Sequence, residues 1–133
     1  SREDFVTRVH EITDGAGVPV VFDSVGADTW EGSLDCLSRF GTMVSFGNAS
    51  GPVPPFSPTV LSAKGSLFLT RPTLFHYIAE RADLVAGAHE LFEVLGDGAV
   101  EVAVNQAYPL AEAAKAHRDL EARANPASTV LLP

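Results

Sequence analysis

The stretch SFGNASGPVPPF, Ser45 to Phe56, is the part of the sequence best suited to contact a ligand. It leaves an apolar run, passes through Gly47, Asn48 and Ser50, and ends in three prolines within four positions. Ligands of open α/β sheets bind where strands end. There, glycine lets a cofactor approach the backbone, and Asn and Ser offer short polar groups. A solvent-exposed turn shaped only by glycine and proline is the alternative.

Charge and composition narrow the class of ligand. The formal net charge is −8 and the nine Lys and Arg residues are spread singly, so no basic stripe is present to neutralise a nucleic-acid backbone. An anionic cofactor remains possible, because backbone N–H groups and one or two placed cations can hold it. The 46% share of hydrophobic residues predicts a packed core in a chain the size of one domain.

The cysteine and histidine residues form no metal-binding or disulfide pattern. Cys36 is the single cysteine, which excludes an internal disulfide. None of the histidines has ligand spacing with another or with Cys36: His10, His76, His89 and His117. No apolar run approaches the roughly 20 residues that cross a bilayer. We therefore expect a soluble, cytoplasmic protein without a zinc site.

The first half of the sequence alternates helix and strand signals. Residues 2–14 repeat apolar positions at helical spacing, and the apolar run 18–22 suits a strand buried on both faces of a parallel sheet. Asp28 can cap a second helix, which carries Trp30, Leu34 and Leu37 and ends before Gly41. Residues 42–47 form the next strand. This order predicts right-handed crossovers.

The second half continues with less regular spacing. Residues 60–64 predict a helical turn, residues 65–72 a third strand ended by Pro72, and residues 73–95 a helix kinked near Ala82 and Asp83. Six apolar residues of this helix are predicted to be core: Phe75, Ile78, Leu84, Leu91, Phe92 and Leu95. The end of the chain predicts strand, helix and strand, with the helix at 111–121. Neither of these two strands has an obvious partner within the chain.

Four segments in the same order carry a resemblance to a known family: DSVG at Asp23 to Gly26, SFGNASGPVPPF, KGSLFLTRPTLFHY at Lys64 to Tyr77, and YPLAEAAKAHRDLEAR at Tyr108 to Arg123, before the closing VLLP. The sequence resembles the C-terminal part of NADPH:quinone oxidoreductases. These are zeta-crystallin-like members of the zinc-free branch of the medium-chain dehydrogenase/reductase superfamily.

The resemblance implies an α/β fold. It consists of a partial Rossmann-like parallel sheet with flanking helices and a C-terminal strand-helix-strand. Residues 1–98 would be the second part of the nucleotide-binding domain, and residues 99–133 would return to the catalytic domain. The sequence contains no G-x-G-x-x-G turn, and the GroES-like domain of such proteins has no counterpart in it. Because that turn holds the pyrophosphate, we expect the chain alone to bind NADPH weakly or not at all.

The resemblance also assigns cofactor contacts at strand ends. They would come from Ser24, Val25 and Gly26, from Phe46, Gly47, Asn48 and Ser50, from Phe68, Leu69 and Thr70 beside the nicotinamide, and from Arg123 on the phosphate side. Asp23 is expected to have a turn or helix-cap role, since the acid that binds ribose follows an earlier strand of this fold. A plain apolar strand at 68–70 and a surface arginine at 123 are the alternatives.

The expected function is hydride transfer from NADPH to a quinone or conjugated carbonyl compound. No catalytic acid, base or nucleophile is expected, because the cofactor supplies the chemistry. A homodimer through the sheet edge, Lys64 to Pro72, is also implied. An enoyl reductase of the same superfamily, or a dimerisation module without activity of its own, are the alternatives.

Overall fold

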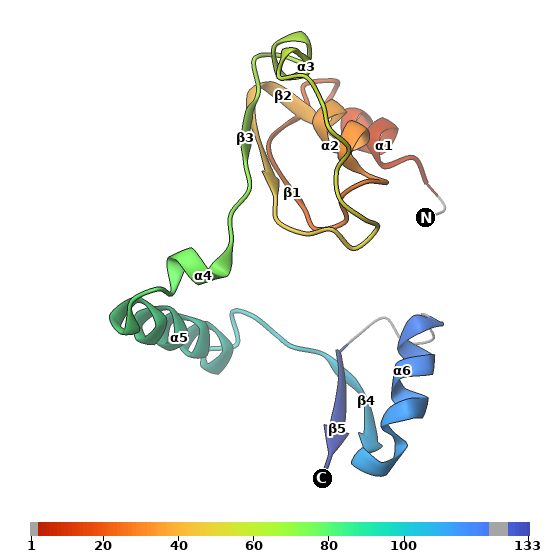
Figure 1. Cartoon of the computed structure of the whole chain (residues 1–133), viewed down its shortest axis with the longest axis vertical. Coiled ribbons are helices and arrows are strands. Elements are labelled where there is room, and N and C mark those ends of the chain that lie inside the picture. The colour runs from red at the N-terminus through yellow and green to blue at the C-terminus, as the bar shows by residue number, and fades with distance from the viewer. Residues whose placement is uncertain (1–2, 123–127) are drawn as a thin grey trace. The chain divides into compact units, whose positions relative to one another are not determined.

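The computed structural model describes residues 3–122 and 128–133. The chain divides into two compact units, Ser1–Tyr77 and Ile78–Pro133. Each unit contains parallel strands connected through helices (Figure 1). The α/β class expected from the sequence is confirmed.

The N-terminal unit contains a three-stranded parallel sheet in the order β1-β2-β3. Its strands are β1 (Val18–Asp23), β2 (Leu37–Ser45) and β3 (Phe68–Thr70), and its helices are α1 (Phe5–Ile12), α2 (Trp30–Asp35), α3 (Thr59–Ala63) and α4 (Leu74–Tyr77). Figure 1 shows α1 and α2 together on one side of β1 and β2. The predicted order of helix and strand is therefore present up to β3.

The core of this unit is small and lies between α2 and the sheet. The cluster consists of Trp30, Leu34, Leu37, Met43 and Leu67, with Leu34 and Met43 fully buried. Val21 packs against it from β1. On the opposite face of β1, the side chains of Val20 and Phe22 are 41% and 72% exposed. The expectation that this strand is buried on both faces is wrong within this chain, because only the face carrying Val21 packs on the core.

Two boundaries near α2 differ from the prediction. The helix begins after Thr29, so Asp28 is not its cap, and the Thr29 side chain makes no cap hydrogen bond. Leu37 belongs to β2 and not to the helix. Apolar spacing does not separate the two possibilities for Leu37, because a buried leucine at the start of a strand fits it as well as one at the end of a helix.

The C-terminal unit contains α5 (Arg81–Gly96), β4 (Val104–Pro109), the 3₁₀ turn η1 (Leu110–Glu112), α6 (Ala113–Glu121) and β5 (Ser128–Leu132). Strands β4 and β5 pair with each other in parallel, with Ala107 opposite Val130. The expectation that these strands lack a partner in the chain is therefore wrong. A parallel pair needs a long crossover, and α6 supplies it. The Tyr108 hydroxyl donates to Asp119 Oδ2 at 2.7 Å and so ties β4 to α6.

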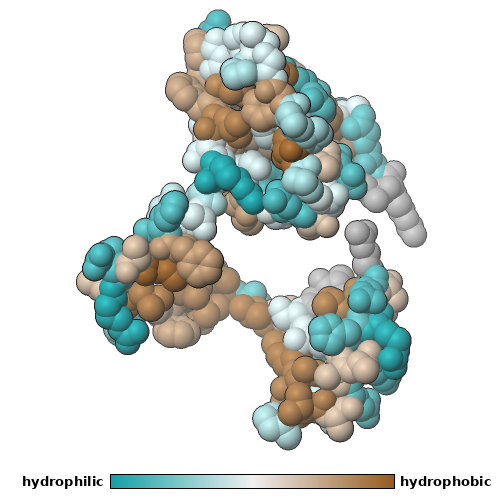
Figure 2. All heavy atoms as spheres, in the orientation of Figure 1, coloured by the Kyte–Doolittle hydropathy of each residue, from teal (hydrophilic) through white to brown (hydrophobic). Residues whose placement is uncertain are grey.

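The helix predicted over 73–95 is two helices. α4 and α5 are separated by Ile78–Glu80, where Glu80 is extended, so the break precedes the predicted kink. The predicted core residues of this region are not buried, and Phe75, Leu84, Leu91 and Phe92 are all exposed. Figure 2 shows the apolar surface of α5 in brown. Among the described residues, no helix is long and apolar enough to cross a membrane.

Candidate functional site

The candidate site lies at the carboxyl ends of β1 and β2. Because these strands are parallel, their ends meet at one edge of the sheet, with Asp23 opposite Ser45. This register brings the segment 24–26 next to the segment 46–50. Two groups of predicted contact residues, separated in sequence, therefore lie side by side.

The Asp23 carboxylate organises the first of these segments. Its Oδ1 accepts hydrogen bonds from the backbone N–H groups of Val25 at 2.8 Å and Gly26 at 2.9 Å. Its Oδ2 accepts from the hydroxyls of Thr29 at 2.8 Å and Ser33 at 2.6 Å. The predicted turn role of Asp23 is confirmed by these bonds.

The Asp23 carboxyl is buried, with 4% of the residue's surface exposed. Burial alone raises the pKa of the carboxyl, but the hydrogen bonds from Ser33, Gly26, Thr29 and Val25 outweigh it, and the pKa falls below the ordinary 3.8. A buried carboxylate charge is tolerated here because each of these four groups donates a hydrogen bond to it.

The backbones of the two segments are bonded directly to each other. Phe46 N donates to Asp23 O at 2.8 Å, Ser50 N donates to Val25 O at 2.8 Å, and Ala49 N donates to Ser24 O at 3.2 Å. Such close approach requires glycine: a Cβ on Gly47 would lie 2.2 Å from the Ser24 carbonyl oxygen. We refer to residues 23–28 and 46–51 together as the double loop.

Within the double loop, the polar side chains have different roles. The Ser50 hydroxyl donates to Val25 O at 2.8 Å and accepts from Asp28 N at 3.0 Å, so its single proton is used inside the protein. The Asn48 side chain is exposed, and no hydrogen bond to it is found among the described residues. The Asn48 side chain is thus available to a ligand, and so are the exposed side chains of Ser24 and Asp28, for which no hydrogen bond within the described residues is found either.

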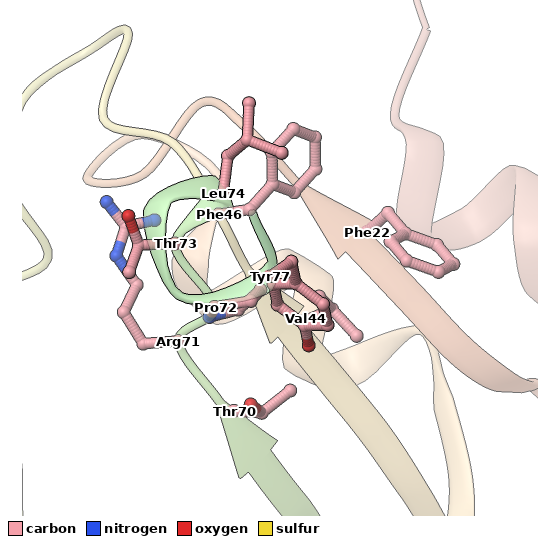
Figure 3. Close-up of a pocket in the computed structure, with 9 residues that line it drawn as sticks. All are labelled: Phe22, Val44, Phe46, Thr70, Arg71, Pro72, Thr73, Leu74 and Tyr77. Atoms are coloured by element: carbon pink, nitrogen blue, oxygen red, sulfur yellow. The ribbon is translucent and has the colours of Figure 1, made fainter. Parts of the chain in front are cut away.

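A pocket of about 860 Å³ adjoins the double loop and contains residues from all three strands or their ends. Figure 3 shows its lining residues, which are Phe22, Val44, Phe46, Thr70, Arg71, Pro72, Thr73, Leu74 and Tyr77. Thr70 is the one predicted contact of β3 that lines it; Phe68 is 61% exposed and Leu69 37%. The lining is largely apolar, with the polar groups of Thr70, Arg71 and Thr73 on β3 and just beyond it.

The sequence pattern assigns Arg71 no role in the site, since Pro72 alone explains why the third strand ends there. The Nη1 atom of Arg71 donates a hydrogen bond to the Ser45 carbonyl oxygen at 2.7 Å. The next residue, Pro72, has no backbone N–H and cannot extend the strand pairing. A guanidinium has five N–H donors, so most of those of Arg71 remain available. Its position directly after a strand of the sheet is the signal that could have identified it. In Figure 3 the guanidinium lies on the opposite side of the view from Phe22.

Two predictions concern groups that do not enter this arrangement. Arg123 lies outside the described residues. Within residues 3–122 and 128–133, no group of three or more His, Cys, Asp or Glu side chains could hold a metal ion. The single thiol, Cys36, is buried, which raises its pKa. These donors do not fit a zinc centre, and no step of the chemistry is assigned to zinc.

Comparison with known proteins identifies the class. The family model described as zinc-binding dehydrogenase matches residues 1–131, and the chain belongs to this family. The family's name thus refers to a metal for which the described residues provide no site.

Individual relatives narrow the resemblance to quinone oxidoreductases. The quinone oxidoreductase of Pseudomonas aeruginosa is 53% identical over 133 residues, covering 100% of this chain and 41% of the relative. The structure of Escherichia coli quinone oxidoreductase complexed with NADPH matches with a TM-score of 0.89 and 51% identity, covering 99% of this chain and 41% of that one. A 2-haloacrylate reductase from Burkholderia is 43% identical, covering 100% of this chain and 40% of the relative. The chain thus spans about two fifths of the length of these relatives.

Proposed function

We propose that the chain is the cofactor-binding part of an NADPH-dependent quinone oxidoreductase. The observation that carries the proposal is the double loop at the carboxyl edge of a parallel sheet: Phe46 lines the largely apolar pocket, and the exposed Asn48 side chain lines a second, smaller pocket with Leu69 and Arg71. The similarity to a quinone oxidoreductase solved with NADPH supports the choice of cofactor and of acceptor. We assign residues 1–98 to the nucleotide-binding domain and residues 99–133 to a segment of the catalytic domain, in a cytoplasmic enzyme.

The contacts follow from which groups are free. Ser24, Val25, Gly26, Phe46 and Gly47 would offer backbone groups and close approach, and Asn48 an amide. Phe68, Leu69 and Thr70 would offer backbone groups beside the nicotinamide. Arg123 would pair with phosphate, since a guanidinium can grip it through two parallel hydrogen bonds. We propose that Ser50, an expected ligand, supports the loop, because its hydroxyl already bonds Val25 and Asp28.

NADPH, when bound, supplies the hydride that reduces the acceptor. The chain itself binds and orients. The aromatic rings of Phe22, Phe46 and Tyr77 give the pocket a largely apolar wall, which is exposed in this chain. The free donors of Arg71 would bind an electron-rich oxygen of the cofactor or acceptor. No proton-transferring side chain of this chain is needed for these roles.

Reduction of a carbon–carbon double bond is the second candidate. The 2-haloacrylate reductase among the relatives favours it, because its name describes an unsaturated acid as substrate. Both reactions would use the same double loop. The two candidate reactions are distinguished by comparing the rates at which the full-length enzyme reduces a quinone and 2-chloroacrylate, with NADPH in excess.

We also propose that β3 pairs with its twin in a homodimer. β3 is at the end of the strand order, has three residues and exposes Phe68 and Leu69. An exposed apolar edge strand needs such a cover. Lys64, at the start of the proposed interface, forms a salt bridge with Asp35 of its own chain. We therefore place the centre of the interface at Phe68 to Thr70. Light scattering should give a dimer for the chain and a monomer for Phe68→Lys.

The test of the proposed function uses two proteins. One is the 133-residue chain. The other is a chimera in which this chain replaces the matching segment of the Pseudomonas aeruginosa relative, which is 53% identical there. Calorimetric titration with NADPH should show binding by the chimera and much weaker binding by the chain. A folded chimera that does not bind NADPH would refute the proposal.

A further inference from the structure

Two side chains of the double loop bond to its backbone: those of Asp23, which is buried, and Ser50, which is half-buried. The Asp23 carboxylate fixes one half, and the Ser50 hydroxyl connects the other half to it. We propose that Asp23 and Ser50 position the double loop for the cofactor without touching the cofactor themselves. This inference rests on the function proposed above.

Asp23 has no capacity left for a ligand. An ionised carboxylate has about four acceptor sites, and this one accepts from Val25, Gly26, Thr29 and Ser33. Only 4% of the residue is exposed. A carboxylate that binds ribose hydroxyls would need at least one open acceptor at the surface. The role left to Asp23 is to hold the N–H groups of the turn in place.

Ser50 is committed in the same way. Its proton is donated to Val25 O, its oxygen accepts from Asp28 N, and its own backbone N–H also donates to Val25 O. Two donors of Ser50 therefore bond to one carbonyl group of the other segment. A phosphate or ribose oxygen acting as acceptor would have to displace the bond to Val25. The hydroxyl consequently fixes the loop that presents Asn48.

The glycines make this arrangement sensitive to small shifts. A Cβ at Gly47 would lie 2.2 Å from Ser24 O, and one at Gly26 would lie 2.4 Å from Gly51 O. The two backbones are thus in direct contact at two points, and neither half can move independently. Loosening the Ser50 bonds should therefore misplace both halves for the cofactor, although no contact to the cofactor is removed.

The experiment compares Ser50→Ala and Ser50→Thr in the chimera, which must first show the same circular dichroism as the parent relative. Ser50→Ala should raise the KM for NADPH by about three- to tenfold, the size expected for losing one or two hydrogen bonds. The kcat and the KM for quinone should stay within about twofold. Ser50→Thr, which keeps a hydroxyl, should restore the KM for NADPH. Asp23→Asn should act in the same direction as Ser50→Ala.

Hydrogen exchange without NADPH separates positioning from direct contact. If Ser50 positions the loop, residues 23–28 and 46–51 should exchange faster in Ser50→Ala than in the wild type. If Ser50 instead only contacted the cofactor, exchange in the cofactor-free loops would not change. Unchanged exchange with weakened NADPH binding would overturn the positioning role.

Leu34→Val, in the core cluster, controls for general destabilisation. If it raised the KM for NADPH as much as Ser50→Ala at equal loss of melting temperature, the effect would be structural only and the inference would fail. A folded wild-type chimera that did not bind NADPH would instead refute the proposed function, and the positioning role with it.

Discussion

Gly47→Ala tests the packing of the double loop most directly. Gly47 does not have a left-handed φ, so alanine meets no backbone strain there. The obstacle is steric, because the new Cβ would lie 2.2 Å from Ser24 O and 2.7 Å from Ser24 Cα. These are backbone atoms held by the bonds between the two segments, and they cannot rotate away as a side chain would. The variant must separate the segments by more than 1 Å to reach ordinary contact, which begins at 3.4 Å.

We expect this substitution to cost about 3 kcal/mol, the upper end for overpacking in a well-packed site. The cost corresponds to a fall of roughly 12–24 °C in melting temperature for a unit of this size. Trp30 is the single tryptophan and is 4% exposed, so its fluorescence reports the unfolding of the N-terminal unit alone. Urea titration of the 133-residue chain, followed at Trp30, measures the change.

Gly15→Ala is the control. Gly15 has a φ of +80°, and a Cβ added there would have nothing within 4 Å, so alanine meets backbone strain and no collision. That strain is worth about 1–2 kcal/mol. Gly47→Ala should therefore be the more destabilising of the two. A midpoint for Gly47→Ala equal to that of the wild type would mean that the two segments are not packed as described.

Three further outcomes follow from the same contacts. Leu34→Ala removes a fully buried side chain of the core cluster and should cost about 2–5 kcal/mol in the same urea titration. Asp23 has a lowered pKa, so its ionised form stabilises the folded state. This stabilisation is complete above pH 3.8, the ordinary pKa, and is lost as the pH falls through the folded-state pKa. Asp23→Asn should therefore flatten the acid side of a plot of unfolding free energy against pH. The Asp119 carboxylate accepts a hydrogen bond from the Tyr108 hydroxyl and so raises the pKa of Tyr108 above 10.0. Asp119→Asn should lower this pKa, which an ultraviolet titration measures.

The sheet of the N-terminal unit can be predicted from the sequence because two separate signals indicate each of its first two strands. The runs 18–22 and 42–47 are apolar, and each is followed by glycine and short polar residues, which indicate where a strand ends. Both strands were found in parallel, as the helix-strand alternation required. The start of β2 at Leu37 was missed, because one buried leucine fits a helix and a strand equally well.

The predictions based on burial failed for a different reason. Apolar spacing in α5 identified Leu84, Leu91 and Phe92 as buried, and all three are exposed. Spacing can show which face of a helix needs a partner, but it does not supply the partner. The pairing of β4 with β5 was missed for the converse reason. The register Ala107↔Val130 depends on a crossover through α6, and a strand pattern does not encode which other strand it joins.

At the candidate site, residue type predicted the place better than the role. The segment 46–50 was expected to offer Asn48 and Ser50 equally, since both are short polar side chains at a strand end. Hydrogen bonding distinguishes the two in the structure, because only the Ser50 hydroxyl bonds to Val25 and Asp28. Arg71 was missed because its neighbour Pro72 explained the end of the strand by itself. A polar residue at such an edge either faces the ligand or holds the loop that does, and only its hydrogen-bond partners decide between the two.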